Sequence, residues 1–188
     1  MEAEGAFSNE TSPAMAPLLK QNLPEIIYAG RKIVYNYGSY PLFGEKTVLI
    51  KNAALIDSSA ARIFQIENAT GPLYKNKDQK DATMVKSHIA EQLFKKEDLN
   101  FDSPQSIPAI SLALGVQETI YGTIKEQGLS MIDYDLLFIR EPQDLFANNN
   151  PFLYQTYIQV RPGTDITKLT NRINALYQKE IAPKDKIR

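Results

Sequence analysis

Residues 152–177, FLYQTYIQVRPGTDITKLTNRINALY, contain the two clearest secondary-structure patterns in the chain. The first half alternates apolar or β-branched residues with polar ones, which predicts one face of a β-strand formed by Phe152, Tyr154, Thr156, Ile158 and Val160. The Arg-Pro-Gly-Thr-Asp stretch at 161–165 predicts a turn. The second half has helical spacing, with an apolar stripe at Ile166, Leu169, Ile173, Leu176 and Tyr177.

Strands and helices are mixed along the rest of the chain, without strict alternation. Stretches rich in apolar, β-branched or aromatic residues predict strands over residues 26–37, 46–50, 82–86, 110–114, 116–124 and 134–140. We expect the first two to be adjacent or to form a hairpin, and 110–114 to pair with 116–124. The unbroken apolar run 134–140 predicts a well-buried strand.

Candidate N-caps precede three further predicted helices. They are Thr11-Ser12 before residues 13–23, Asp57-Ser58-Ser59 before 60–65, and Ser87 before a helix that carries Ile89, Leu93 and Phe94 on one face. Together the elements indicate an α+β fold.

The composition excludes several classes of protein. The 188 residues are 43% hydrophobic and 23% charged, as in ordinary globular domains, and the net charge of −1 provides no field for nucleic acid. With no cysteine, the chain has no disulfide, thiolate metal site or cysteine nucleophile, although this does not decide its compartment. No run of 18 apolar residues and no signal-peptide pattern occurs, so we expect neither an anchor nor a leader within this stretch.

Few residues suggest catalysis. His88 is the sole histidine, so a metal site or a serine–histidine relay would depend on it alone; an ordinary polar residue in a first helical turn is the simpler explanation. Asp133 and Asp135 would point to one face of a strand, which suits a cation or paired acid chemistry, or only a solvated strand end. No Walker A loop, Gly-x-Gly-x-x-Gly motif or EF-hand loop is present.

Two groups of residues are candidates for a binding surface. Tyr28, Tyr35, Tyr37 and Tyr40 could form a platform for a partner or an amphipathic ligand, or could simply pack across neighbouring strands. The lysines at 75, 77 and 80 alternate with acidic residues, which is typical of a solvated loop.

Four stretches, taken in order, carry a resemblance to a known family. They are residues 14–25 (AMAPLLKQNLPE, followed by a strand with Arg31), 54–57 (ALID, with Ile63-Phe64), 82–87 (ATMVKS, with Ala90 and Phe94) and 120–125 (IYGTIK, with Ser130 and the segment 131–138). In this order the chain, over about residues 11–181, resembles the MacB-like periplasmic core domain of FtsX-type ABC transporter permeases.

The resemblance implies a single two-lobed periplasmic ectodomain spanning residues 1–188. A porter-like lobe with a ferredoxin-like βαβ arrangement would be built from both chain ends, about 11–43 and 129–182, and a mixed α/β lobe would be inserted between them, about 44–128. Because both ends would continue into membrane helices, we expect the helices from Pro13 and from Ile166 to lie in one lobe.

The implied function is that of a non-catalytic part of an integral membrane protein, on the periplasmic face of the inner membrane, that transmits ATP-driven movement. The resemblance implies no cofactor or metal. Its partners would be a cytoplasmic ATPase acting through the membrane domain, a second permease subunit in a homodimer or heterodimer, and a periplasmic or outer-membrane protein. The alternative is a free-standing periplasmic module that binds a peptide or small molecule.

Overall fold

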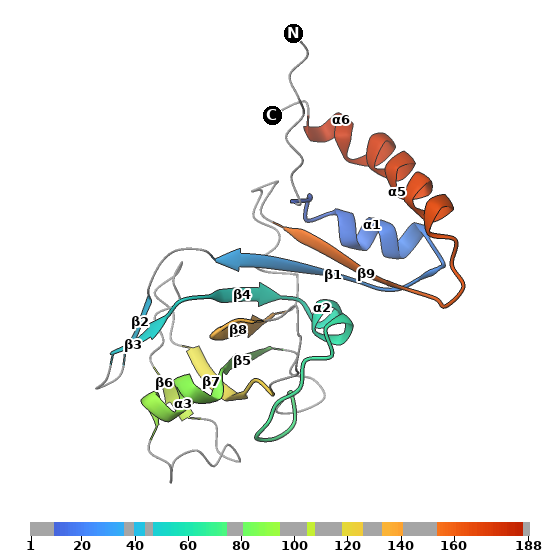
Figure 1. Ribbon diagram of the computed structural model, residues 1–188. Helices are drawn as coiled ribbons and strands as arrows, with labels where there is room; N and C mark the ends of the chain where they lie inside the picture. Colours follow the sequence, from blue (N-terminus) through green and yellow to red (C-terminus); the bar gives the residue numbers. More distant parts are fainter. Residues whose placement is uncertain are drawn as a thin grey trace.

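The computed structural model describes residues 10–35, 40–43, 47–74, 81–94, 105–107, 118–125, 133–140 and 154–185 (Figure 1). These residues form the α+β fold that the sequence predicts. Several predictions lie outside the described residues: the strand at 110–114 and its pairing, the lysine-rich loop, Tyr37 and Phe152.

One mixed sheet runs through the described part of the chain. Its order is β6 (Gln105–Ile107), β7 (Glu118–Thr123), β5 (Ala82–Val85), β8 (Leu136–Ile139), β4 (Ala53–Ile56), β1 (Ile26–Tyr35) and β9 (Gln155–Val160). The pairs β4–β8 and β5–β7 are parallel, and the other neighbours are antiparallel. Every residue of β8 is buried, which confirms the prediction from its apolar run.

The expected pairing of the first two predicted strands is wrong. β3 (Thr47–Ile50) pairs instead with β2 (Tyr40–Phe43) in a separate hairpin, and β1 pairs with β4 and β9. The reason is that the chain forms a strand at Tyr40–Phe43, directly before β3, and this local partner takes the place of β1.

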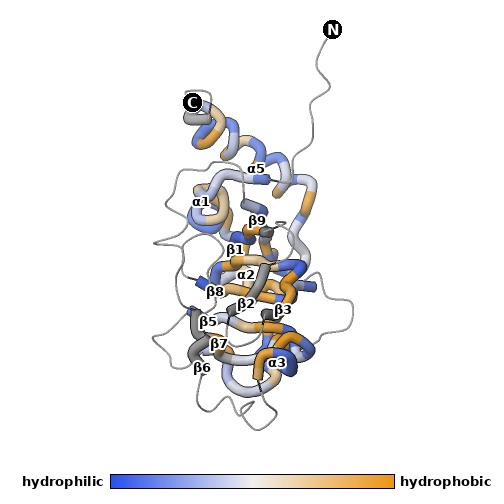
Figure 2. The backbone as a smooth tube through the Cα atoms, turned by 90° about the vertical axis from the view of Figure 1, so that its left-hand side faces the viewer, coloured by the Kyte–Doolittle hydropathy of each residue, from blue (hydrophilic) through white to orange (hydrophobic). Residues whose placement is uncertain are grey.

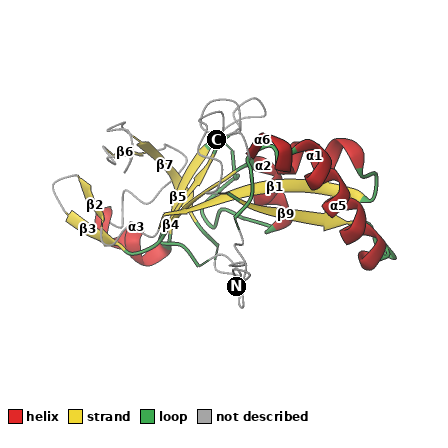
Figure 3. Ribbon diagram, turned by 90° about the horizontal axis from the view of Figure 1, so that it is seen from above, coloured by secondary structure: helices red, strands yellow, loops and turns green. Residues whose placement is uncertain are grey.

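Helices cover parts of both faces of the sheet. α1 (Met15–Asn22) and α5 (Ile166–Glu180) lie beside β1 and β9, α6 (Ala182–Asp185) continues from the end of α5, and α3 (Ser87–Leu93) lies near the β2–β3 hairpin (Figure 1). α2 (Ser58–Ile63) packs on β1. From above, α1 and α5 lie at one end of the molecule and the β2–β3 hairpin and α3 at the other (Figure 3). None of the helices in the described residues combines the length and apolarity that crossing a bilayer requires.

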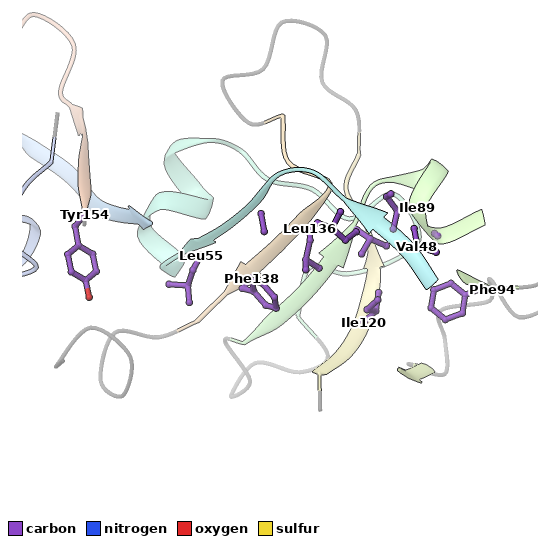
Figure 4. Close-up of a cluster of buried hydrophobic side chains, with 12 residues drawn as sticks. Val48, Leu55, Ile89, Phe94, Ile120, Leu136, Phe138 and Tyr154 are labelled. Atoms are coloured by element: carbon purple, nitrogen blue, oxygen red, sulfur yellow. The ribbon is translucent and has the colours of Figure 1, made fainter. Parts of the chain in front are cut away.

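Three clusters of buried side chains form the core. One lies between α3, the hairpin and the sheet and includes Val48, Ile89, Phe94 and Leu136 (Figure 4). A second, around Ile56 and Met84, is covered by α2 and the segment after it. The third joins α1 and α5 to β1 and β9. Figure 2 shows how apolar residues gather on the stacked central strands.

We call α1, α5, α6, β9 and the first half of β1 the terminal lobe, and the remaining described elements the central lobe. Met15, Leu19 and Leu23 pack in one cluster with Leu169 and Ile181, so the first and last long helices share a lobe as predicted. The lobe boundaries at 44 and 128 stay a prediction. β8, from the 129–182 segment, lies between β4 and β5 of the 44–128 segment.

Some helix details differ from the sequence prediction. Asp57 caps α2 as expected, accepting from the Ala60 amide at 2.8 Å. α1, however, has Ala14 at its N-cap without a side-chain bond, because the Ser12 hydroxyl accepts from the Ala14 amide just outside the helix. Lys86 occupies the N-cap of α3, so Ser87 is already helical. Ile166 is 58% exposed, since the buried stripe of α5 begins one turn later at Leu169.

Candidate functional site

β1 joins the two lobes. Residues Ile26 to Lys32 pair with β9, whereas Lys32 to Tyr35 pair with β4. Lys32 therefore stands at the crossover, opposite Gln155 on one side and Ile56 on the other. Among the described strands β1 alone belongs to both lobes, so residues 30–32 lie where the two lobes meet.

A buried ion pair lies beside this crossover. Arg31 Nε contacts Asp57 Oδ2 at 3.1 Å, and the Arg31 amide donates to the same oxygen at 3.0 Å. The Arg31 guanidinium also donates to the Pro13 carbonyl at 3.1 Å, just ahead of α1. Because Asp57 in turn caps α2, one pair of side chains ties α1, β1 and α2 together.

Burial sets the protonation behaviour of this pair. Asp57 is 3% exposed, and burial raises the pKa of its carboxyl above the ordinary value, although the Ala60 amide and Arg31 both act to lower it. Loss of water thus outweighs the attraction to Arg31, as is common for buried ion pairs. Its hydrogen bonds fix the positions of α1, β1 and α2 relative to one another.

A ring of aromatic side chains surrounds the ammonium of Lys32. Its Nζ lies 4.9 Å from the ring centre of Tyr157, 5.6 Å from that of Tyr134 and 5.9 Å from that of Phe64. Phe64 and Tyr157 also meet edge to face, with centroids 4.7 Å apart. Burial alone would lower the pKa of Lys32, but the hydroxyls of Tyr157 and Tyr134 together outweigh it and raise the pKa. The lysine is therefore a buried cation.

Close backbone packing completes the junction. A Cβ atom added to Gly30 would lie 2.2 Å from the Ala60 amide nitrogen and 2.6 Å from its Cα. Only glycine permits α2 to approach β1 this closely. Gly30, Arg31 and Lys32 thus form, with their partners, what we call the junction site.

The tyrosines proposed as a platform are only partly placed. Tyr28 is half-buried, and its ring lies 5.6 Å from the Arg62 guanidinium of α2. Tyr35 and Tyr40 belong to β1 and β2, but the structure does not describe their side chains. The platform remains a prediction.

Asp133, Asp135 and His88 do come together, around Lys86. The Lys86 ammonium pairs with Asp133 and lies 3.7 Å from Asp135, while His88 Nε2 lies 3.9 Å from Asp135. The two aspartates precede β8 instead of lying within it, and Asp135 is 6% exposed, so it does not serve as a solvated strand end. Its Oδ2 accepts from the Lys51 amide at 2.9 Å. Within the described ranges no three His, Asp or Glu side chains are placed to hold a metal ion.

These contacts predict that replacing the two aspartates by alanine lowers the free energy of unfolding by different amounts. Asp135→Ala should lower the free energy of unfolding by about 1–3 kcal/mol, because it leaves the Lys51 amide without its acceptor. Asp133→Ala should cost at most about 1 kcal/mol, because that carboxylate is exposed. Urea titrations of both variants check the difference. Equal losses would show that the buried acceptor carries no structural role.

Comparison with known proteins places the fold. No protein-family profile and no curated protein matches the chain. Among solved structures, a domain of a protein described as a permease from Porphyromonas gingivalis matches with a TM-score of 0.68 at 17% identity, covering 91% of this chain and 71% of that one. The extracellular domain of the ABC-type transporter YknZ from Gram-positive bacteria matches at 0.61 and 17%, covering 93% and 86%.

The periplasmic region of MacB from Actinobacillus actinomycetemcomitans matches at 0.62 and 11% identity, covering 90% of this chain and 73% of that one. The fold is thus that of extracytoplasmic domains of transporter permeases. More narrowly, it is the MacB-like periplasmic fold that the resemblance implied.

Sequence reasoning missed most of the junction site. Arg31 was noted only as part of the family pattern, and Asp57 only as a cap. The available signal was the pair Arg31-Lys32, two cations in the middle of an otherwise apolar strand. Such residues are almost never fully buried without partners, so they indicate partners elsewhere in the chain.

Proposed function

We propose that this chain is the extracytoplasmic domain of a MacB-type ABC transporter permease, and that it passes ATP-driven movement to a partner or substrate without catalysing a reaction. The observation that carries the proposal is the convergence of the chain's two ends. Met15, at the start of α1, and Ile181, at the end of α5, are buried in the same cluster of the terminal lobe.

This arrangement suits attachment of both ends to neighbouring membrane helices. Movement of those helices would act on the terminal lobe first. β1 continues from that lobe into the central sheet, so the displacement would reach the central lobe through the junction site. In this proposal the domain lies at the periplasmic face of the inner membrane, and ATP is hydrolysed by a separate cytoplasmic ATPase.

The proposed partners follow from this placement. A second permease copy would stand beside the first, and a periplasmic or outer-membrane protein would contact the central lobe, which lies farthest from the converging ends (Figure 1). The native gene provides a first check. Apolar segments of about 20 residues flanking this stretch on both sides are expected, and their absence from the gene would favour the free-standing binding module.

A spin-label experiment in the complete transporter tests the transmission of movement. This stretch has no cysteine, so in a transporter whose cysteines elsewhere are replaced, Glu91→Cys on α3 provides one exposed label in each copy. We expect the distance between copies to change when ATP is trapped by a hydrolysis-deficient ATPase.

Asn174→Cys on the exposed side of α5 is the matched position in the terminal lobe. Its distance should change less than that of Glu91→Cys, because the central lobe lies farther from the membrane. Distances that are the same with and without ATP at both positions would contradict the proposed function.

A further inference from the structure

The aromatic ring around Lys32 is built from both lobes. Lys32 stands at the crossover of β1, and Tyr157 belongs to β9 of the terminal lobe, whereas Phe64 follows α2 and Tyr134 precedes β8 in the central lobe. A single ammonium therefore contacts rings that would separate if one lobe slid or tilted against the other.

The charge of Lys32 fixes the positions of the surrounding rings more strictly than an apolar side chain would. Apolar contacts are non-directional and tolerate sliding, whereas a cation above the faces of aromatic rings is attracted to fixed positions. The attraction is strongest where water is excluded, and Lys32 is only 5% exposed. Its raised pKa agrees with a cation that stays charged in this place.

The other contacts at the crossover join different groups. β1 pairs with β9 as far as Lys32 and with β4 from Lys32 onward, so among the described strands it alone runs from one lobe into the other. Arg31 and Asp57 hold α2 against β1 and the residue ahead of α1, and Phe64 meets Tyr157 edge to face, but these contacts do not include Tyr134. Among the interactions that the structure describes, the Lys32 ring alone links Tyr157 of β9 to Tyr134.

We propose that Lys32 is a coupling residue: its ammonium, held by Phe64, Tyr134 and Tyr157, locks the two lobes so that the domain moves as one rigid lever. The inference rests on the proposed function, which it deepens by naming the group that carries movement from lobe to lobe.

The first test uses the 188-residue chain itself, labelled at both Glu91→Cys and Asn174→Cys. With Lys32 intact, the distribution of distances between the labels should be narrow. Lys32→Met keeps the length of the stem and removes the charge, and it should broaden the distribution. Hydrogen exchange of the β1–β4 amides should become faster by about 5- to 30-fold in this variant.

Two control variants separate coupling from general stability. Lys32→Arg keeps a cation that stacks on aromatic rings, so it should restore the narrow distribution. Ile120→Val removes one buried methylene group on β7 and should destabilise the protein without broadening the distance distribution. A distribution that is equally narrow in Lys32→Met, or equally broad in Ile120→Val, would overturn the proposal.

The complete transporter distinguishes this inference from the proposed function. In Lys32→Met we expect the ATP-dependent change to persist at Asn174→Cys and to be lost at Glu91→Cys. An unaltered change at Glu91→Cys would refute the coupling role alone. The absence of any change with Lys32 intact would refute the proposed function. The distance distributions of the isolated chain would still test whether Lys32 couples the two lobes.

Discussion

Asp57→Ala is expected to lower the free energy of unfolding by about 3–5 kcal/mol, because it leaves the buried Arg31 guanidinium without its carboxylate. The same substitution removes the side-chain cap of α2 and the acceptor of the Arg31 amide. Chemical denaturation monitored by circular dichroism measures the loss.

Matched variants isolate the buried charge from the cap. Asp165→Ala removes the corresponding cap of α5 at an exposed site, and it should cost only about 1 kcal/mol. The double variant Arg31→Met with Asp57→Ser keeps a capping hydroxyl and removes both charges, so it should be more stable than Asp57→Ala. A double variant as unstable as the single one would show that the uncompensated charge is not the cause.

The same carboxyl predicts a pH dependence. Burial raises the pKa of Asp57 in the folded protein above its value of about 3.8 in the unfolded chain, so the folded protein binds this proton more tightly. The resulting stabilisation is complete below the unfolded pKa and is lost as pH rises through the folded pKa. The unfolding free energy of the native protein minus that of Asp57→Ser should therefore fall over this range, and a rising difference would contradict the assignment.

Gly30→Ala is the second substitution with a large expected effect, a loss of about 3 kcal/mol. The new methyl group would overlap backbone atoms of Ala60, which cannot rotate away as a side chain would. α2 would have to move from β1, and the contact between Phe64 and Tyr157 would weaken with it. Thermal unfolding of the purified variant measures the loss.

Gly71→Ala is the control for this substitution. The nearest atom to its added Cβ is 3.9 Å away, so the unfolding midpoint should barely change. If Gly30→Ala were as stable as Gly71→Ala, the close approach of α2 to β1 would not be a real constraint.

Local patterns were predictable from the sequence. The helical spacing after Asp165, the apolar run of β8 and the cap at Asp57 each depend on residues close together in the chain, and all three are confirmed. Contacts between residues far apart in the sequence were predicted wrongly or were not predicted. The predicted partner of β1 was wrong, because the pairing of β1 with β9 depends on residues more than 100 positions apart.

The junction site illustrates the same limit. No residue near Lys32 in the sequence indicates that Phe64, Tyr134 and Tyr157 surround it, because these three residues come from separate parts of the chain. Asp135 likewise looked like a solvated residue, but the Lys51 amide makes it a buried acceptor. Charged residues in apolar surroundings were the informative positions in this sequence.

The strand order also has a consequence for how the polypeptide matures. β1 is made early. One of its neighbours, β4, follows soon after it in the chain, but the other, β9, ends only at Val160. Long-range pairing of this kind slows folding, and an exposed apolar strand is prone to aggregate while it waits. A growing chain therefore leaves the β9-facing edge of residues 26–32 unpaired until residue 160 has emerged.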